Sequence, residues 1–320
     1  MSALERQVAA GLSVLLGLSA ATGVLTRRSG RRDRKRRYPV HRRADGTLVE
    51  FAAHLPDDAR YVVLLEAGLG MPHEYWDWVC AELPGDAGWF RYHRPGYGLS
   101  TPRPEFALRE HFDLLDELRN AHFPERPVVL VGHSLGGYLA AAYAAFHRGT
   151  DRGIRRLVLV DSTNIRQVHR TAGSAPDRWA RQTMVLERIF ALTGLGALRP
   201  AANRRRTYAD EVNRTHRAFL SEYRSWATAH REYRASQDFP ELGDVGVPMD
   251  VVTVSNGLAS SAAHRSAQAE LLDLSTESEH HFVQDAEHES VVATREHAAE
   301  VVRVIAAGMR SEVEEVRDAR

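Results

Sequence analysis

Short apolar runs alternate with longer amphipathic stretches from about residue 40 onward. The runs are rich in Val and Leu and are barely interrupted by polar residues, which is typical of parallel strands covered by helices on both faces. The predicted strands are residues 61–65, 89–92, 128–131, 157–160, 251–254 and 280–283, with an antiparallel strand near 48–52 ahead of them. Helical patterns occupy residues 108–121, 137–147 and 296–307. The alternation predicts an α/β fold with a mostly parallel β-sheet flanked by helices.

The alternation stops between residues 162 and 247. Helical patterns cover residues 177–192 and 208–236, and no convincing strand pattern occurs in the interval. A structureless loop of this length is rare in a compact domain, so we expect an inserted helical cap. The expected organisation is a hydrophobic segment at 1–26, a basic linker at 27–37, a core in two parts at 38–161 and 248–310, and a helical cap at 162–247 between them.

An uncharged segment covers residues 8–26 near the N-terminus. As a helix it would extend about 28 Å, close to the thickness of a bilayer core. A membrane anchor, a cleaved signal peptide and an amphipathic or buried helix are the alternatives. Arg6 is offset by Glu5 and the large positive block follows the segment, which is the reverse of a signal peptide. The arrangement predicts one N-terminal membrane span that anchors a cytoplasmic body, with the membrane as a partner.

Charge is balanced over the whole chain but is unevenly distributed. The 320 residues contain 42 Lys and Arg and 42 Asp and Glu. Residues 27–37 hold eight basic residues and one acid, a net charge of +7, so the rest of the chain sums to −7. A mildly acidic body offers no footprint for nucleic acid. The basic run reads as a solvated linker that, beside a span, would also attract anionic lipid headgroups.

Residues 132–136 read Gly-His-Ser-Leu-Gly and fit the pattern G-x-S-x-G, with Ser134 at its centre. A predicted strand precedes the motif and a helical pattern follows it from Gly137. In this strand–turn–helix setting the serine hydroxyl stands at a helix N-terminus, where backbone amides favour negative charge. Ser134 is therefore the candidate nucleophile, and an ordinary strand-to-helix turn is the alternative.

With this motif, the chain resembles the α/β-hydrolase superfamily over about residues 38–308. Residues 64–70 (LLEAGLG) follow a strand, as the oxyanion segment of that family does. Residues 94–100 (RPGYGLS) resemble its R-x-G-x-G-x-S turn, and residues 285–290 (DAEHES) resemble the loop that carries its late histidine. The resemblance implies the α/β-hydrolase fold and a catalytic triad in the chain order Ser, acid, His.

Some positions differ from the usual pattern of that family. Glu66-Ala67 replaces the usual His-Gly, and His93 stands where an Asp usually precedes the arginine. Dehalogenases and epoxide hydrolases of this fold use an Asp nucleophile, whereas this chain has Ser134. The serine therefore favours acyl chemistry over those two reactions.

A serine nucleophile needs a base to accept its proton, and the base must be held in one orientation. His288 follows the last predicted strand and precedes the last helix, as the resemblance requires, so it is the candidate base. His280 and His281 fall on the strand itself, and His297 falls inside the helix.

The acid of the triad is harder to identify. Many members of the family carry it after the penultimate strand, where this chain has Asn256 and no carboxylate before Glu270. Asp161 directly follows the preceding strand, at the sheet edge where the nucleophile turn lies. We predict Asp161 as the acid. A buttress at the start of the cap is the alternative role for Asp161, and Asp285 or a glutamate beside the histidine is the alternative acid.

The resemblance also implies an oxyanion hole formed by the backbone N–H groups of Leu69 and Leu135. The expected function is a carboxylic ester hydrolase that acts on a small ester-like substrate through an acyl-enzyme, with no metal and no cofactor. An acyltransferase, a peptidase or a C–C hydrolase on the same triad, and a non-catalytic ligand-binding relative, remain alternatives. The sequence leaves the oligomeric state open. Cys80 is the single cysteine, so no intramolecular disulfide is possible.

Overall fold

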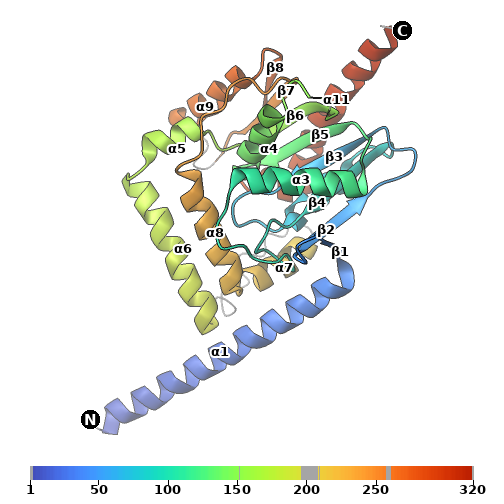
Figure 1. Ribbon diagram of the computed structural model, residues 1–320. Coiled ribbons are helices and arrows are strands. Elements are labelled where there is room, and N and C mark those ends of the chain that lie inside the picture. The colour runs from blue at the N-terminus through green and yellow to red at the C-terminus, as the bar shows by residue number, and fades with distance from the viewer. Residues whose placement is uncertain (1–2, 151, 196–207, 209, 257–260, 319–320) are drawn as a thin grey trace.

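The computed structural model describes residues 3–150, 152–195, 208, 210–256 and 261–318 (Figure 1). Its centre is an eight-stranded sheet in the order β1-β2-β4-β3-β5-β6-β7-β8. The strands are β1 (Val40–Arg42), β2 (Leu48–His54), β3 (Tyr61–Glu66), β4 (Ala87–Tyr92), β5 (Val128–His133), β6 (Ile154–Val160), β7 (Met249–Val254) and β8 (Ser278–Val283). β1 pairs antiparallel with β2, and β2 pairs antiparallel with β4. The other six strands, β4-β3-β5-β6-β7-β8 in sheet order, are parallel to one another. The predicted fold class is confirmed.

Helices cover both faces of the sheet, because successive side chains of a strand point to opposite faces. Val62 and Leu64 of β3 belong to one hydrophobic core, and Tyr61, Val63 and Leu65 belong to the other. The first core contains residues of α3 (Leu108–His122) and α4 (Leu135–Phe146). The second contains residues of α2 (Asp77–Glu82), α10 (Ser290–Ala293) and α11 (Arg295–Asp318). The α9 helix (Ala262–Ala269) follows β7 and leads into the short helix η5 (Glu270–Leu274).

Four helices connect β6 to β7 in the described part of the chain, and we call them the cap helices. They are α5 (Ile165–Thr171), α6 (Ala175–Thr193), α7 (Asp210–Leu220) and α8 (Tyr223–Ser236). α6 and α8 pack against each other beside the sheet (Figure 1). Residues 196–207 of the predicted cap lie outside the described residues. Ser134 follows the carboxyl end of β5 and lines a cavity together with residues of the cap helices, so its turn lies between the sheet and the cap.

The N-terminal helix α1 (Ala3–Arg37) corrects the prediction of a membrane span. Among the described residues, no helix is long enough and apolar enough to cross a membrane. Gly, Ser and Thr dilute the apolar residues of 8–26, and the same helix continues without a break through the basic residues of 27–37. The predicted transmembrane segment is therefore wrong. The predicted membrane-anchored localisation, with a cytoplasmic body and the membrane as a partner, depended on this span and is corrected with it.

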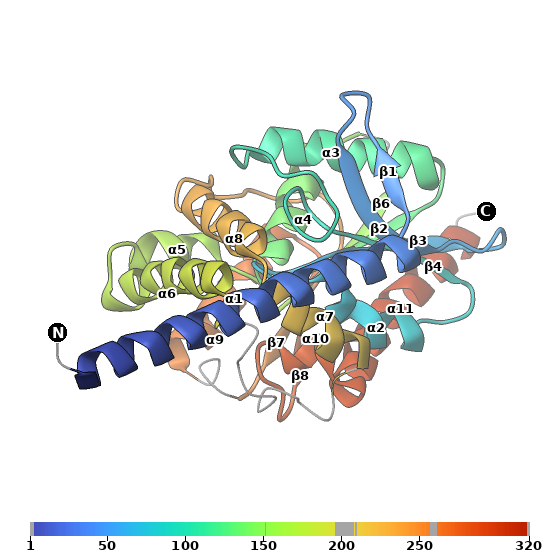
Figure 2. The ribbon, with the colours of Figure 1, turned by 90° about the horizontal axis from the view of Figure 1, so that it is seen from below.

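α1 instead contacts the rest of the protein (Figure 2). The Ser19 hydroxyl donates a hydrogen bond to the carbonyl of Thr193 at the end of α6. Arg27 donates to the carbonyls of Ala191 and Ser221. The helix therefore packs along the cap helices with its middle part.

The basic block contains one buried arginine. Arg34 is 6% exposed, and its Nη1 lies 2.6 Å from Glu50 Oε1 and 2.8 Å from Glu74 Oε1. Its neighbours Arg32, Lys35 and Arg36 are exposed. Residues 27–37, predicted as a linker, thus form the C-terminal part of α1, and one of their charges is paired inside the protein.

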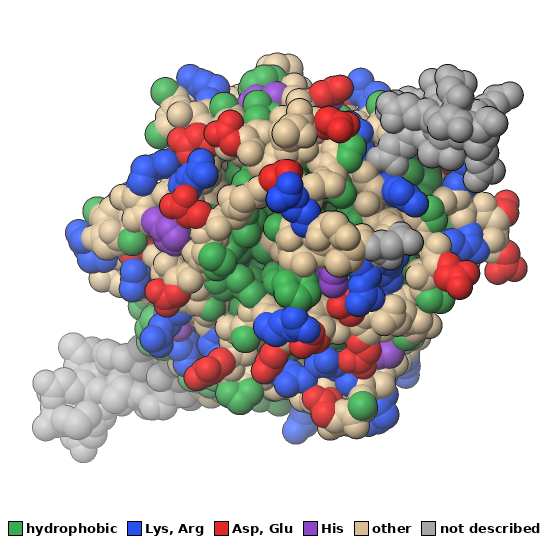
Figure 3. Space-filling view, turned by 45° about the horizontal axis from the view of Figure 1, so that its top comes forward, with side chains coloured by type: hydrophobic (Ala, Val, Ile, Leu, Met, Phe, Trp, Pro, Cys, Tyr) green, Lys and Arg blue, Asp and Glu red, His purple; other side chains and the backbone are tan. Residues whose placement is uncertain are grey.

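The face drawn in Figure 3 mixes both signs of charge. Lys and Arg side chains alternate with Asp and Glu side chains over this face, and hydrophobic side chains gather near its centre. Interspersed charges of this kind give no extended field of one sign on the face shown.

Candidate active site

Ser134 lies in a strained turn between β5 and α4. Its φ of 54° and ψ of −124° fall in a region that residues with a side chain rarely adopt. Gly136 permits the turn, because a Cβ at that position would lie 2.3 Å from the carbonyl oxygen of Glu66. Backbone strain of this kind persists where the surrounding structure over-determines it and is common at functional sites.

Asp161 and His288 come together across a large sequence separation. His288 Nδ1 donates to Asp161 Oδ2 at 2.5 Å, and the Asp161 side chain is fully buried whereas that of His288 is half exposed. Burial acts to raise the pKa of the Asp161 carboxyl, but hydrogen bonds from His264 and His288 outweigh burial and lower it. Asp161 is therefore a carboxylate at neutral pH, and the contact leaves Nε2 of His288 available for a proton.

His133 fixes the loop of His288 against the nucleophile turn. The Nε2–H of His133 donates to the backbone carbonyl of His288 at 2.7 Å, and the two rings are 4.6 Å apart. Burial and the neighbouring His288 lower the pKa of His133 to about 3, so this ring is neutral. Because His133 directly precedes Ser134, this hydrogen bond holds the loop of His288 next to the turn of Ser134. Among the described residues, the Ser134 hydroxyl makes no hydrogen bond to His288, a contact that is often long without bound substrate.

The other candidates for the acid and the base lie elsewhere. Asp285 occupies an exposed turn with φ 57°, where its own N–H donates to the hydroxyl of Ser255. His280 contacts the hydroxyl of Thr253. His281 contacts Asp250, and His297 contacts Thr294 within the last helix.

A second histidine, which no sequence motif marks, contacts Asp161. His264 Nε2 donates to Asp161 Oδ1 at 2.8 Å from the first turns of α9. We call Asp161, His264 and His288 the Asp161 cluster. The one available signal is position: α9 follows β7, which is where the family resemblance expected an acid.

The two predicted oxyanion donors lie beside the nucleophile. Leu69 and Leu135 line the same cavity as Ser134. The segment before Leu69 is packed against the turn, since a Cβ on Gly68 would lie 3.3 Å from Ser134 Cβ. Arg94 holds this segment by donating to the carbonyls of Ala67 and Gly68 at 2.5 and 3.0 Å. Backbone N–H groups fixed in this way are suited to bind a developing oxyanion.

Arg94 also connects residues 66–68 to helix α8 of the cap. Its guanidinium donates to Glu66 on β3 and with two nitrogens to Glu232 on α8. The Tyr97 hydroxyl donates to Glu232 and accepts the N–H of Gly70. The replacement of His-Gly by Glu66-Ala67 therefore supplies a carboxylate for Arg94. The sequence identified the Arg94 turn but not its partner Glu232.

The cavity at Ser134 has a volume of about 240 Å³. Leu69, Ser134 and Leu135 line it from the core, and the segment between β6 and β7 contributes Thr163, Val168, Thr171, Asp177, Tyr233, Ser236 and Gln237. Polar side chains dominate the wall on the cap side. Asp177 in this wall is already hydrogen-bonded to Arg181 and Tyr233. The site therefore offers a compact and largely uncharged space.

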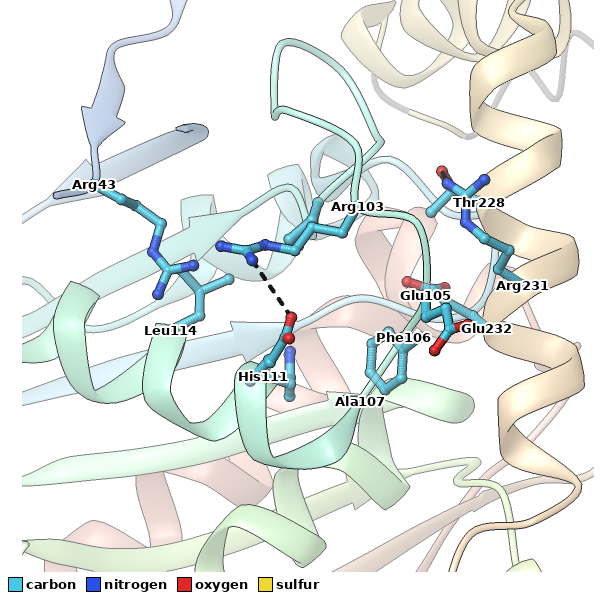
Figure 4. A pocket seen from close by; sticks show the side chains of 12 residues that line it. Arg43, Arg103, Glu105, Phe106, Ala107, His111, Leu114, Thr228, Arg231 and Glu232 are labelled. Carbon is cyan, nitrogen blue, oxygen red and sulfur yellow. Dashed lines mark hydrogen bonds and ion pairs between the residues drawn. The ribbon is translucent and has the colours of Figure 1, made fainter. Parts of the chain in front are cut away.

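A second cavity lies near the start of α3 and has a volume of about 30 Å³, enough for about one water molecule (Figure 4). Two of its three arginines pair with carboxylates, Arg43 with Glu117 and Arg103 with Asp45 and Glu110. The third, Arg231, donates to the hydroxyl of Thr228. Its small volume and the pairing of its arginines make this second cavity a poorer candidate for a substrate site than the cavity at Ser134.

Two groups of described side chains have the residue types of a metal site: a partly buried one of Asp250, Glu279 and His281, and a fully buried one. Glu50, His73 and His93 are buried, and their potential ligand atoms lie within 4.8 Å of one another. Arg34 Nη1 lies among them, 2.6 Å from Glu50 and 3.5 Å from His93 Nδ1. We call Arg34, Glu50, His73, Glu74 and His93 the Arg34 cluster. The guanidinium supplies one positive charge beside the two carboxylates, so part of the buried negative charge of the cluster is compensated by the chain itself.

The parallel sheet, the strained serine between β5 and α4 and the helices inserted between β6 and β7 define an α/β protein with a strained strand-to-helix turn beside a cavity. The chain belongs to the alpha/beta hydrolase family, whose model matches residues 62–304. It is 33% identical over 94 residues to the proline iminopeptidase PfmaB of Pestalotiopsis fici, a match that covers 28% of this chain and 32% of that protein.

Solved structures show the same fold at low sequence identity. The Cif epoxide hydrolase of Acinetobacter nosocomialis has a TM-score of 0.65 at 15% identity, with 83% of this chain and 87% of that chain covered. A thermophilic esterase of Thermogutta terrifontis has a TM-score of 0.63 at 19% identity, with 86% and 98% covered. These similarities establish the fold, and the residues at the site must carry any argument about the reaction.

Proposed function

We propose that this protein is a serine hydrolase that cleaves an ester or related acyl bond through Ser134, His288 and Asp161. The observation that carries the proposal is the Asp161–His288 hydrogen bond, formed beside a strained serine that lines a cavity. The acid contacts Nδ1 of the ring, which leaves Nε2 to act as the base, as a Ser-His-Asp triad requires.

The reaction proceeds in two halves. Ser134 Oγ bonds to the carbonyl carbon of the substrate while its proton passes to His288 Nε2, and the N–H groups of Leu69 and Leu135 stabilise the oxyanion. The tetrahedral species collapses, the bond to the leaving oxygen breaks, and His288 returns the proton to that oxygen. Water then attacks the acyl-enzyme with the same transfers in reverse order and releases the acid. Asp161 stays ionised and stabilises the imidazolium in both halves.

The cavity suggests the kind of acyl group. A volume of about 240 Å³ suits a compact group rather than a long alkyl chain. The hydroxyl and amide groups of Thr171, Ser236 and Gln237 favour a group that can form hydrogen bonds. We expect short p-nitrophenyl esters to be cleaved with a higher kcat/KM than the octanoate or palmitate esters.

A peptidase is the second candidate, because the partial match is to a proline iminopeptidase. The same site would expel an amine in place of an alcohol. Prolyl p-nitroanilide and p-nitrophenyl acetate, compared at equal concentration, separate the two reactions. Faster turnover of the anilide favours the peptidase, and faster turnover of the ester alone favours the esterase.

Covalent labelling tests the nucleophile itself. A fluorophosphonate reacts with an activated serine and needs no knowledge of the natural substrate. We expect labelling of the full chain and no labelling of Ser134→Ala. Equal labelling of the two proteins would overturn the proposal.

A further inference from the structure

The second histidine on Asp161 is not explained by a triad of three residues. His264 and His288 donate to different oxygens of one carboxylate, at 2.8 and 2.5 Å. The Asp161 side chain has no exposure to solvent, so each oxygen depends on the protein for its hydrogen bond.

The two histidines use different ring nitrogens. His288 contacts Asp161 through Nδ1 and His264 contacts it through Nε2. A triad base uses Nδ1 toward the acid and Nε2 toward the serine, which fits His288. His264 therefore has the geometry of a donor that holds the acid.

Helix α9 is fastened to the turn that carries Asp161. Gln268, one turn after His264, donates to the carbonyl of Ser162 at 2.7 Å, and Asn164 donates to the carbonyl of Ala267 at 2.7 Å. The hydroxyl of Ser261 accepts the N–H of His264 at 3.1 Å and caps the start of the helix. The turn needs such support, because Asp161 has a φ of 42°.

We propose that His264 is a positioning residue of this site, which holds the Asp161 carboxylate in the orientation that directs His288 toward Ser134. His264 lies on α9, the helix that follows β7. The inference rests on the proposed function, since it assigns a role relative to Ser134 and His288. Loss of His264 leaves Asp161 Oδ1 buried without a donor, so the carboxylate is free to rotate away from His288.

Three variants test the role with p-nitrophenyl acetate and a fluorophosphonate. His264→Ala should lower kcat and the labelling rate roughly 10- to 100-fold with little change in KM, the usual cost of losing a supporting hydrogen bond at a site. His264→Gln keeps a side-chain donor and should recover most of the lost activity. His169→Ala removes an exposed histidine of α5 and serves as the matched control, with activity unchanged.

A double-mutant cycle separates positioning from mere structural support. In an Asp161→Asn background, His264→Ala should change kcat less than about twofold, because no carboxylate remains to be positioned. Gln268→Ala loosens the same helix without touching Asp161 and should affect kcat less than His264→Ala does. The inference would be overturned if His264→Ala lowered kcat by the same factor in the original protein and in Asp161→Asn. It would also be overturned if His264→Gln were as impaired as His264→Ala.

Failure of the proposed function gives a different result. If Ser134→Ala keeps its activity, the site itself is misassigned. If Ser134→Ala is inactive and His264→Ala is fully active, the nucleophile stands and only the role of His264 is refuted. Should His264→Ala not fold, the Gln variant and its cycle with Asp161→Asn still decide the question.

Discussion

The Asp161 cluster and the Arg34 cluster both place two histidines on a buried carboxylate, but their surroundings differ. His73 and His93 have side-chain exposures of 0% and 1%, and Arg34 lies against the carboxylate that they share. His264 and His288 have exposures of 20% and 48%. Because the first cluster is closed and Arg34 balances part of its negative charge, it can stabilise the fold. The second is open on the histidine side and is held near Ser134 through His133, so it is the cluster for which we propose a role toward a substrate.

The comparison of the two clusters predicts that the largest loss of kcat follows from substitution of Ser134. Ser134→Ala should lower kcat by roughly 10⁶-fold, the loss seen when a serine triad loses its nucleophile. Thermal unfolding should change little, because alanine fits the space of serine. Steady-state kinetics with p-nitrophenyl acetate and a thermal melt measure both quantities. Retention of more than a few per cent of the activity would show that the open cluster is not catalytic.

The acid should have the next largest effect. Asp161→Asn keeps the shape but removes the charge that stabilises the imidazolium, and we expect a loss of about 10⁴-fold in kcat. Asp285→Asn is the matched control in an exposed turn and should cost less than about tenfold. The reverse order of the two losses would move the acid to Asp285 and leave the Ser134–His288 pair intact.

The Arg34 cluster should respond in stability and not in turnover. Arg34→Met keeps the aliphatic stem and leaves two buried carboxylates without their cation, which should lower the free energy of unfolding by about 3–5 kcal/mol. Arg32→Gln in the exposed part of the same helix should change it by less than about 0.5 kcal/mol. Urea unfolding measures both variants. A large loss of kcat in the folded Arg34 variant would mean that the two clusters are coupled.

Much of the fold could be predicted because its determinants are local. Apolar runs mark the buried strands, and the G-x-S-x-G turn requires small residues on both sides of Ser134 wherever the rest of the chain goes. Asp161 could be selected by its place at the end of a strand beside the nucleophile strand. The roles of these residues remain a proposal, although the structure brings Asp161 and His288 into contact.

The features that the sequence did not reveal depend on long-range packing. Asp161 and His264 are 103 residues apart, and no motif marks the position of His264. Nothing local distinguishes Arg34 from the other basic residues of its block, because burial is decided by Glu50 and Glu74. The uncharged stretch of 8–26 has the length of a span, but Gly, Ser and Thr dilute its apolar residues, and no local pattern shows that its helix contacts the end of α6.

The smallest predicted effect is a pH dependence of the Arg34 variant. Burial acts to raise the pKa of Glu74, and the charges of Arg34 and the nearby histidines outweigh it and lower the pKa to about 2. The folded protein thus gains stability from Glu74 above the ordinary pKa of about 4.5, and loses it as the pH falls toward 2.

Arg34→Met removes the main opposing charge, so burial should raise the pKa of Glu74 in the folded variant. A carboxyl whose folded pKa is raised gains stability as the pH falls, because the folded state then binds the proton more readily than the unfolded state. Burial and the neighbouring His73 lower the pKa of His93 to about 4, and loss of Arg34 also allows this ring to take up a proton beside Glu50. Both changes stabilise Arg34→Met relative to the original protein as the pH falls.

The difference in unfolding free energy between the original protein and Arg34→Met should therefore be largest at pH 7. It should shrink by about 1–2 kcal/mol by pH 5, as a one-unit pKa shift is worth about 1.4 kcal/mol. Urea titrations at pH 7, 6 and 5 would measure it, and a gap that stays constant would show that Arg34 acts through packing and not through charge.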